Sequence, residues 1–292
     1  MRRSDKYIYF HKLNNINNMT ERIILGLDIS TKCTGVSIVY VDENEEIKPI
    51  VVTHLRHKVS SKITGIESLF LKCDLFMEKL KEILLENSLY KDGKSLITDV
   101  IIEEPLISSN NKYTVATLLR YNGMIAYRVY NLLKIIPKFI SSSDARMFGV
   151  PQLMAVRKYN KKGEIYPVKK LIKSIFNSEL VLFGAYPFDC AKKYILWNYI
   201  SERFPEIQWI YDKKGDLKTE NFDASDSLIC VIGYLNYEKY HDTKPRVIGT
   251  SNTENNELGY EFEFCNQVFS TQIDLTSNIT TETTVDSYQD NK

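Results

Sequence analysis

Hydrophobic and polar positions follow two kinds of repeat along the first part of the chain. Three β-branched runs come first, Arg22–Ile29, Gly35–Val41 and Pro49–Leu55, and short polar turns separate them. This pattern predicts a β-meander. From Gly65 to Leu85 the apolar residues recur at spacings of three and four, which is typical of a helix with one buried face. The chain therefore begins with three strands and a helix.

Helices and strands alternate in the next part of the chain. The expected elements are a strand, a helix, a second strand and two closing helices, at Thr98–Ile102, Tyr113–Leu133, Ile135–Ile140, Cys190–Phe204 and Asp223–Tyr240. Pro137 suggests that the second of these strands lies at a sheet edge, because proline cannot donate a ladder hydrogen bond. The order predicts an α/β fold, a mixed five-stranded sheet with helices on both faces.

Composition divides the remaining chain into three further segments. Residues 1–20 are polar and Asn-rich and are expected to form a flexible leader, while residues 246–292 are expected to form an acidic, largely disordered tail. Residues 151–188 are rich in Lys and Tyr and interrupt the alternation, so we interpret them as a basic insertion. The folded domain is expected to span residues 21–245.

Several classes of protein are excluded by composition. The sequence has no apolar run long enough to cross a bilayer and no signal peptide, so we expect a cytoplasmic protein. Five scattered cysteines without a C-x-x-C pair argue against a disulfide framework or a zinc site, and we interpret them as reduced core residues. The histidines form no catalytic set, and His54 and His57 are expected at the surface.

The formal net charge of +1 conceals an asymmetry. Residues 251–292 carry eight acids and one Lys, a balance of −7, so the first 250 residues carry +1 + 7 = +8. A basic body suits a polyanionic partner, although solubility alone also explains it.

Acidic residues occur at three places where a carboxylate is unfavourable or specifically placed. Asp28 ends an apolar strand, and Glu103 and Glu104 end the buried strand after it. Asp223 and Asp226 share one face of a helix's first turn. Each has a structural explanation, since Asp28 can form a turn and the last two can cap the helix. Together they indicate a site for hard divalent cations, which prefer oxygen ligands.

Three motifs resemble those of RuvC-type Holliday-junction resolvases in the RNase H-like superfamily. Leu25–Ile38 (LGLDISTKCTGVSI) is similar to that family's first-strand motif, Ile101–Pro105 (IIEEP) to its fourth-strand motif, and Asp223–Leu228 (DASDSL) to its final-helix motif. They occur in the family's order within about residues 22–240. Ser30, Pro105 and the insertion depart from the family pattern. The departures favour a divergent member of the family, with a phage as one candidate source, acting in the cytoplasm of a bacterial cell or infected host.

The resemblance implies a site, a reaction and an assembly. The catalytic and metal-binding residues would be Asp28, Glu103, Asp223 and Asp226, with two Mg²⁺ or Mn²⁺ ions per active site. The reaction would be hydrolysis of four-way (Holliday) DNA junctions, as in recombination and repair. A homodimer would cut the junction symmetrically, and Tyr113–Leu133 could supply its interface, although Leu118, Leu119, Ile125 and Val129 could equally be core.

Basic residues predict where DNA would bind. The insertion carries a cluster of them next to Tyr159 and Tyr166, and two more open the following helix. The candidate DNA-binding residues are Arg157, Lys158, Lys161, Lys162, Lys169, Lys170, Lys173, Lys192 and Lys193. Such a cluster can follow phosphates while aromatic rings stack on bases. A solvated loop is the alternative interpretation of the insertion.

Three other functions compete with the resolvase. Another RNase H-like nuclease, acting on flaps, nicks or RNA:DNA hybrids, would use the same carboxylates. An ATPase of the actin and Hsp70 group shares a motif similar to Leu25–Gly35, but the sequence has no second phosphate motif of that group. An inactive scaffold would have no physical need to keep four repelling carboxylates.

Overall fold

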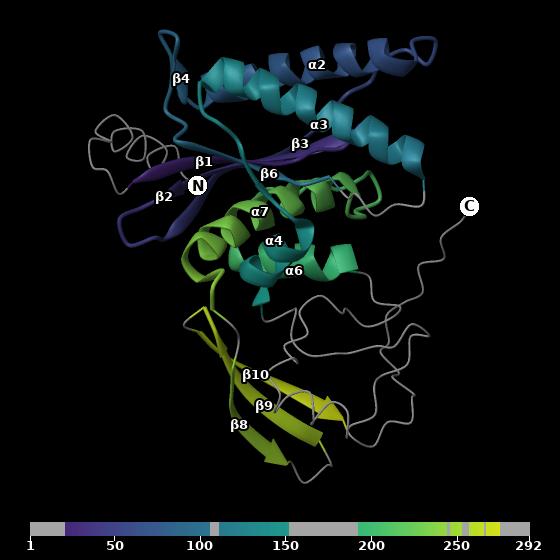
Figure 1. Cartoon of the computed structure of the whole chain (residues 1–292). Coiled ribbons are helices and arrows are strands. Elements are labelled where there is room, and N and C mark those ends of the chain that lie inside the picture. Colours follow the sequence, from purple (N-terminus) through teal and green to yellow (C-terminus); the bar gives the residue numbers. More distant parts are fainter. Residues whose placement is uncertain are drawn as a thin grey trace. The chain divides into compact units, whose positions relative to one another are not determined.

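The computed structural model describes residues 21–105, 111–151 and 192–243, together with residues 246–252, 257–265 and 267–274. The chain divides into two compact units, Met1–Met154 with Asp189–His241, and Ala155–Phe188 with Asp242–Lys292. Figure 1 shows the helices and strands of both units. Among the described residues, no helix has both the length and the apolar character that a bilayer crossing requires.

The first unit contains a mixed five-stranded sheet. Its order is β3-β2-β1-β6-β7, and the strands are Ile47–Arg56, Cys33–Val41, Arg22–Asp28, Asp99–Glu103 and Lys138–Ile140 respectively. The β1–β2 and β2–β3 pairs are antiparallel, whereas β1–β6 and β6–β7 are parallel. The predicted meander and mixed five-stranded sheet are confirmed. β7 is the edge strand expected from Pro137, although it is shorter than predicted.

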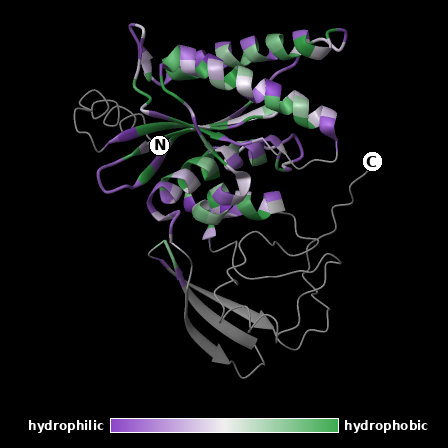
Figure 2. Ribbon diagram, in the orientation of Figure 1, coloured by the Kyte–Doolittle hydropathy of each residue, from purple (hydrophilic) through white to green (hydrophobic). Residues whose placement is uncertain are grey.

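Helices cover both faces of this sheet. Helices α2 (Gly65–Glu86) and α3 (Lys112–Leu133) lie on one face, and α7 (Glu220–Tyr240) lies on the other (Figure 1). Helices α4 (Ser142–Gly149) and α6 (Lys192–Arg203) pack against α7. Hydrophobic residues run along the central strands between these layers (Figure 2). The α/β architecture is that of the RNase H-like fold expected above, and its assignment rests on strand order and direction.

The core lies between the sheet and the α2–α3 layer. Leu25 and Leu27 of β1 are fully buried there with Phe76 of α2. Ile125 and Val129 of α3 are also fully buried, so these two residues belong to the core rather than to a dimer surface. Leu119 is 44% exposed and Leu118 is half-buried, so solvent reaches these two members of the predicted surface.

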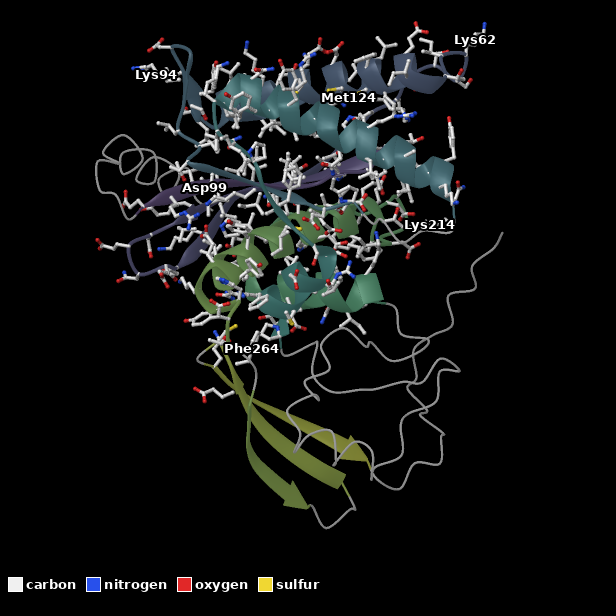
Figure 3. The ribbon with its side chains drawn as sticks, viewed as in Figure 1. Lys62, Lys94, Asp99, Met124, Lys214 and Phe264 are labelled. Carbon is white, nitrogen blue, oxygen red and sulfur yellow. The ribbon has the colours of Figure 1, made fainter. Side chains whose placement is uncertain are left out.

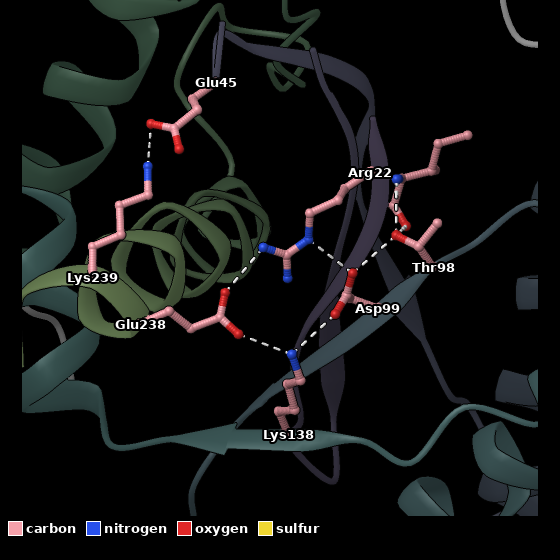
Figure 4. Close-up of polar contacts among 8 residues, drawn as sticks. Arg22, Glu45, Thr98, Asp99, Lys138, Glu238 and Lys239 are labelled. Carbon is pink, nitrogen blue, oxygen red and sulfur yellow. Dashed lines mark hydrogen bonds and ion pairs between the residues drawn. The ribbon is translucent and has the colours of Figure 1, made fainter. Parts of the chain in front are cut away.

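A network of four charged side chains ties the end of α7 to the sheet (Figure 4). Arg22 contacts Asp99 and Glu238 at 3.0 Å each, and Lys138 contacts the same two carboxylates at 3.1 and 2.9 Å. These residues come from β1, β6, β7 and α7, so the network joins three neighbouring strands and a helix. Each carboxylate accepts hydrogen bonds from two cationic side chains, so the network is expected to stabilise the fold more than an isolated surface ion pair would.

The second unit overturns part of the prediction for residues 246–292. Instead of a largely disordered tail, it contains an antiparallel sheet of order β10-β9-β8, with strands Gln267–Asp274, Glu257–Phe264 and Arg246–Asn252. The physical reason is visible in β9, where Leu258, Tyr260, Phe262 and Phe264 alternate with Glu or Gly. This period of two favours a strand whatever the net charge.

Three smaller features differ from the predictions. Helix α4 and the hairpin of β4 (Tyr90–Lys91) and β5 (Lys94–Ser95) were not anticipated. His57 is only 4% exposed, and its Nε2 lies 3.1 Å from Thr34 Oγ1, so its prediction as a surface residue is wrong. The chain turns inward after β3 and places this ring edge-on to Phe76. Most of the predicted insertion, residues 152–188, lies outside the described residues.

Candidate active site

Two parallel strands bring two of the predicted carboxylates to the same sheet edge. Leu27 of β1 pairs with Ile102 of β6, so the next residues, Asp28 and Glu103, end neighbouring strands side by side. Glu104 is exposed, and its backbone N–H donates to the carbonyl of Ile140 at 2.8 Å. Side chains alternate along a strand, so Glu103 and Glu104 point in different directions. Of these two acids, Glu103 faces the site.

Close backbone contact places helix α7 above this edge. A Cβ atom added to Gly35 of β2 would lie 1.8 Å from the carbonyl oxygen of Asp223, and one added to Gly26 would lie 2.6 Å from that of Ser227. Ser37 Oγ also donates to the Ser227 carbonyl at 2.9 Å. Glycine and a small hydroxyl side chain therefore allow the helix to lie directly on the strands. Its first turns carry Asp223 and Asp226 over the end of β1.

Burial and mutual repulsion make these carboxylates hard to ionise together. Burial raises the pKa of Asp28 well above its ordinary value, and the charges of Glu103 and Asp226 raise it further, with a smaller contribution from Asp223. Burial and Asp226 raise the pKa of Glu103 to about 7. Burial is also the main reason that the pKa of Asp226 is raised. The structure thus brings all four predicted acids into one electrostatic group.

Two cationic side chains partly neutralise the group. Lys193 of α6 lies with its Nζ 3.5 Å from Asp223 Oδ1. Burial lowers the pKa of this lysine, but Asp223, Asp226 and Asp28 raise it by a larger amount. Arg146 of α4 lowers the pKa of both Glu103 and Asp226. With all four acids ionised, these two cations would leave an excess of negative charge, and this is the repulsion that, after burial, raises the pKa values.

Two buried cysteines border the site as neutral thiols. Cys230 Sγ donates to Glu103 Oε2 at 3.4 Å, and burial followed by the charge of Glu103 raises the pKa of this thiol well above its ordinary value. Burial and Asp223 raise the pKa of Cys33 to about 12. A thiol must ionise to act as a nucleophile, so these cysteines serve as packing groups and hydrogen-bond donors. Cys33, Cys73, Cys230 and Cys265 are free and buried, as expected, and Cys190 lies outside the described residues.

The predicted DNA-binding residues have different outcomes. Lys193 reaches the site, and Lys192 lies in the same first turn of α6. The other predicted residues lie outside the described residues, and they are Arg157, Lys158, Lys161, Lys162, Lys169, Lys170 and Lys173. Sequence reasoning missed Arg146. The sequence does carry a signal for α4, the helix that holds Arg146, because Ser141 begins a Ser-x-x-Asp capping pattern after the last strand. In the structure Ser141 Oγ accepts from the N–H of Asp144 at 3.0 Å.

The donor set fits a divalent cation by charge and atom type. No group of three or more His, Cys, Asp or Glu side chains in the described ranges is arranged as a ready-made metal site. The fit rests instead on carboxylate oxygens, which Mg²⁺ prefers, and on the raised pKa values of Asp28, Glu103 and Asp226. A bound cation would relieve the repulsion that raises them.

The solved structures that resemble this chain include Holliday junction resolvases and an exopolyphosphatase. The chain is similar to Thermus thermophilus RuvC in complex with a Holliday junction substrate (8% identity, 75% of this chain, 95% of that chain, TM-score 0.40). It is also similar to the yeast mitochondrial Holliday junction resolvase Ydc2 (12% identity, 80% of this chain, 85% of that chain, TM-score 0.39). A further similar structure is an exopolyphosphatase from Cytophaga hutchinsonii (14% identity, 62% of this chain, 60% of that chain, TM-score 0.28). No protein-family model and no curated protein matches the sequence. With identities and TM-scores this low, the strand order and the site geometry carry the interpretation.

Proposed function

We propose that this chain is a metal-dependent endonuclease that cuts four-way DNA junctions. The observation that carries the proposal is the convergence of Asp28, Glu103, Asp223 and Asp226 from β1, β6 and α7 into one partly buried group. A structural protein gains nothing from burying repelling carboxylates at a sheet edge. An enzyme that must hold cations beside a phosphodiester does benefit from such a cluster, because the carboxylates bind the cations.

The chain's own residues would divide the work of the reaction. Asp28, Glu103 and Asp226 would hold two Mg²⁺ or Mn²⁺ ions, and Asp223 would add a ligand or orient the attacking water. The ions would supply Lewis-acid stabilisation of charge on the phosphodiester. Cys230 orients Glu103 through its hydrogen bond, and Lys193 positions Asp223. We expect products with 5′-phosphate and 3′-hydroxyl ends.

The choice of a four-way junction rests on the resemblance of the three motifs to resolvases. One structural neighbour, RuvC from Thermus thermophilus, was solved in complex with a Holliday junction substrate, and that substrate belongs to RuvC. For this chain we propose the same substrate class and a two-fold homodimer, because symmetric cutting of a junction needs two sites.

The test compares labelled four-way junction, flap, nicked duplex and RNA:DNA hybrid, each with Mg²⁺, Mn²⁺ or EDTA. We expect paired symmetric nicks in the junction that require the metal and disappear in Asp28→Asn. Metal-dependent cutting of another substrate would keep the site but replace the proposed substrate. If no substrate is cut with either metal, the nuclease proposal is wrong, and ATP hydrolysis becomes the activity to assay.

Adjacent acids provide a matched control for the site. Glu103→Gln is expected to abolish cleavage and to leave junction binding in EDTA unchanged. Glu104→Gln removes the same charge one residue later, from an exposed side chain, and is expected to retain most of the activity. Equal losses in both variants would show that the assignment of Glu103 is wrong.

A further inference from the structure

A group of lysines follows the strand ends near the candidate site, in the β1–β2 turn, the segment after β3 and helix α2. We call this group the lysine rim, and it consists of Lys32, Lys58, Lys62, Lys72 and Lys79. Lys32 lies four residues after Asp28, in the turn between β1 and β2. Lys58 and Lys62 follow β3, and Lys72 and Lys79 belong to α2.

Strand pairing brings the rim to the catalytic end of the sheet. Cys33 at the start of β2 pairs with Arg56 at the end of β3, and Asp28 pairs with Gly35. The N–H of His57 also donates to the carbonyl of Lys32 at 3.4 Å. The segments that carry Lys32 and Lys58 therefore run next to each other, within a few residues of the carboxylate at Asp28.

Two rim lysines bind backbone carbonyls instead of carboxylates. Lys72 Nζ donates to the carbonyl of Thr31 at 3.0 Å, and Lys79 Nζ donates to that of Arg56 at 3.1 Å. None of the ion pairs among the described residues includes a rim lysine, so their charges stay unneutralised there. The pKa of the nearby His57 ring is lowered to about 4 by burial, which is the larger cause, together with the positive charges of Lys79 and Lys72, which act on that ring.

Acids are absent from the lysine face in the first part of α2 and from the segment before it. Lys72 and Lys79 are seven residues apart and share one face of α2. At about 100° per residue, Glu67, Asp74 and Glu78 lie roughly 200–240° away from Lys72, on the opposite face. Residues 47–66 contain no acid at all. Glu82 and Glu86 share the lysine face at the C-terminal end of α2, so the acid-free part of this face is the N-terminal portion of the helix, which continues from the acid-free segment 47–66.

We infer that the lysine rim binds the phosphate backbone of the DNA strand that enters the candidate active site. The inference rests on the proposed nuclease function and goes beyond it by naming the surface that holds the substrate. Carboxylates repel phosphates, so a strand that approaches Asp28 needs cations beside it. Figure 3 places Lys62 at the outer end of the helical layer and Lys94 at its other end, so the path would run from the site toward Lys62.

The test removes the three exposed rim charges and leaves Lys72 and Lys79, which hold the turns. The rim variant is Lys32→Gln/Lys58→Gln/Lys62→Gln, and the control is Lys81→Gln/Lys91→Gln/Lys94→Gln, which removes three exposed charges elsewhere. Binding of a labelled four-way junction is measured in EDTA at several salt concentrations, with thermal unfolding of each variant. We expect the rim variant to bind at least about tenfold more weakly, with a salt slope about 2–3 smaller, because each phosphate contact contributes about 0.9.

The outcomes separate this inference from the proposed function. The control variant should bind within about twofold of the unmodified protein. If the unmodified protein binds the junction but the rim variant keeps its salt slope, or the control loses as much affinity, the rim inference is wrong and the nuclease proposal stands. If the unmodified protein binds no DNA, both are wrong.

Discussion

Gly35 of β2 lies directly beneath Asp223 of α7, so close that a Cβ atom on the glycine would be 1.8 Å from the aspartate's carbonyl oxygen. The obstructing atom belongs to helix backbone, which cannot rotate away as a side chain can. Any larger residue at position 35 must therefore displace the first turn of α7. This contact links a strand glycine to the position of two candidate catalytic acids.

Gly35→Ala is expected to destabilise the fold by about 2 kcal/mol or more and to reduce cleavage. Gly123→Ala is the matched control, because nothing lies within 4 Å of a Cβ there and the residue is in helix α3. The control should stabilise by roughly 0.5–1 kcal/mol, since alanine favours helices. Chemical denaturation and cleavage rates of both variants check this. A Gly35→Ala protein with unchanged stability would contradict the close packing.

Without metal, Glu103 should make the fold less stable as pH rises. Its pKa is raised from 4.5 to about 7 by burial and by Asp226, so between these values the folded state holds a proton that the unfolded state releases. The stability that depends on this proton is complete below about pH 4.5 and is lost as pH rises through 7. The loss should reach up to about 3 kcal/mol.

The measurement is thermal unfolding from pH 4.5 to 8 in EDTA, with Glu103→Gln beside the unmodified protein. The difference between the two should grow with pH in favour of Glu103→Gln, and saturating Mg²⁺ should reverse it. Parallel stability curves in EDTA would mean that Glu103 is not under electrostatic strain.

Arg146 should set the acidic limit of activity through Glu103 and Asp226. This arginine lowers the pKa of both acids, so Arg146→Gln should raise those values and move the acidic limb of the cleavage rate to higher pH. Arg128→Gln is the control, since that side chain pairs with Asp74 between α2 and α3. A uniform loss of rate at every pH would instead give Arg146 a merely structural role.

The four-residue network in Figure 4 should stabilise the fold above about pH 4. Burial alone would raise the pKa of Asp99, but hydrogen bonds from Arg22 and Lys138 lower it to about 2. Because this pKa is below the ordinary value of 3.8, the stabilisation is present above that pH and is lost as pH falls toward 2.

Asp99→Asn should therefore lower stability at neutral pH by on the order of 1–2 kcal/mol and flatten the acid dependence. Asp92→Asn changes an exposed turn residue in the β4–β5 hairpin and should have little effect. Urea unfolding at pH 7 and pH 3 distinguishes them. Equal stabilities of Asp99→Asn and Asp92→Asn at pH 7 would show that the network contributes little.

Local patterns were sufficient for most of the fold. The run at Arg22–Ile29, the three-and-four spacing after Gly65 and the position of Pro137 predicted β1, α2 and the edge strand β7 within a few residues. The acidic C-terminal segment is the exception, because its composition predicts disorder whereas its periodicity predicts a strand. The alternating residues Glu257–Phe264 form β9, so periodicity is the better guide there.

The sequence by itself determined the order of elements and the acids that end them, because periodicity and turn residues are properties of neighbouring positions. Only the tertiary structure decided that Arg146 acts on Glu103 and Asp226 and that α7 rests on Gly35. These relationships join residues far apart in the chain. Strand register and helix packing set them, and both depend on all the contacting elements at once.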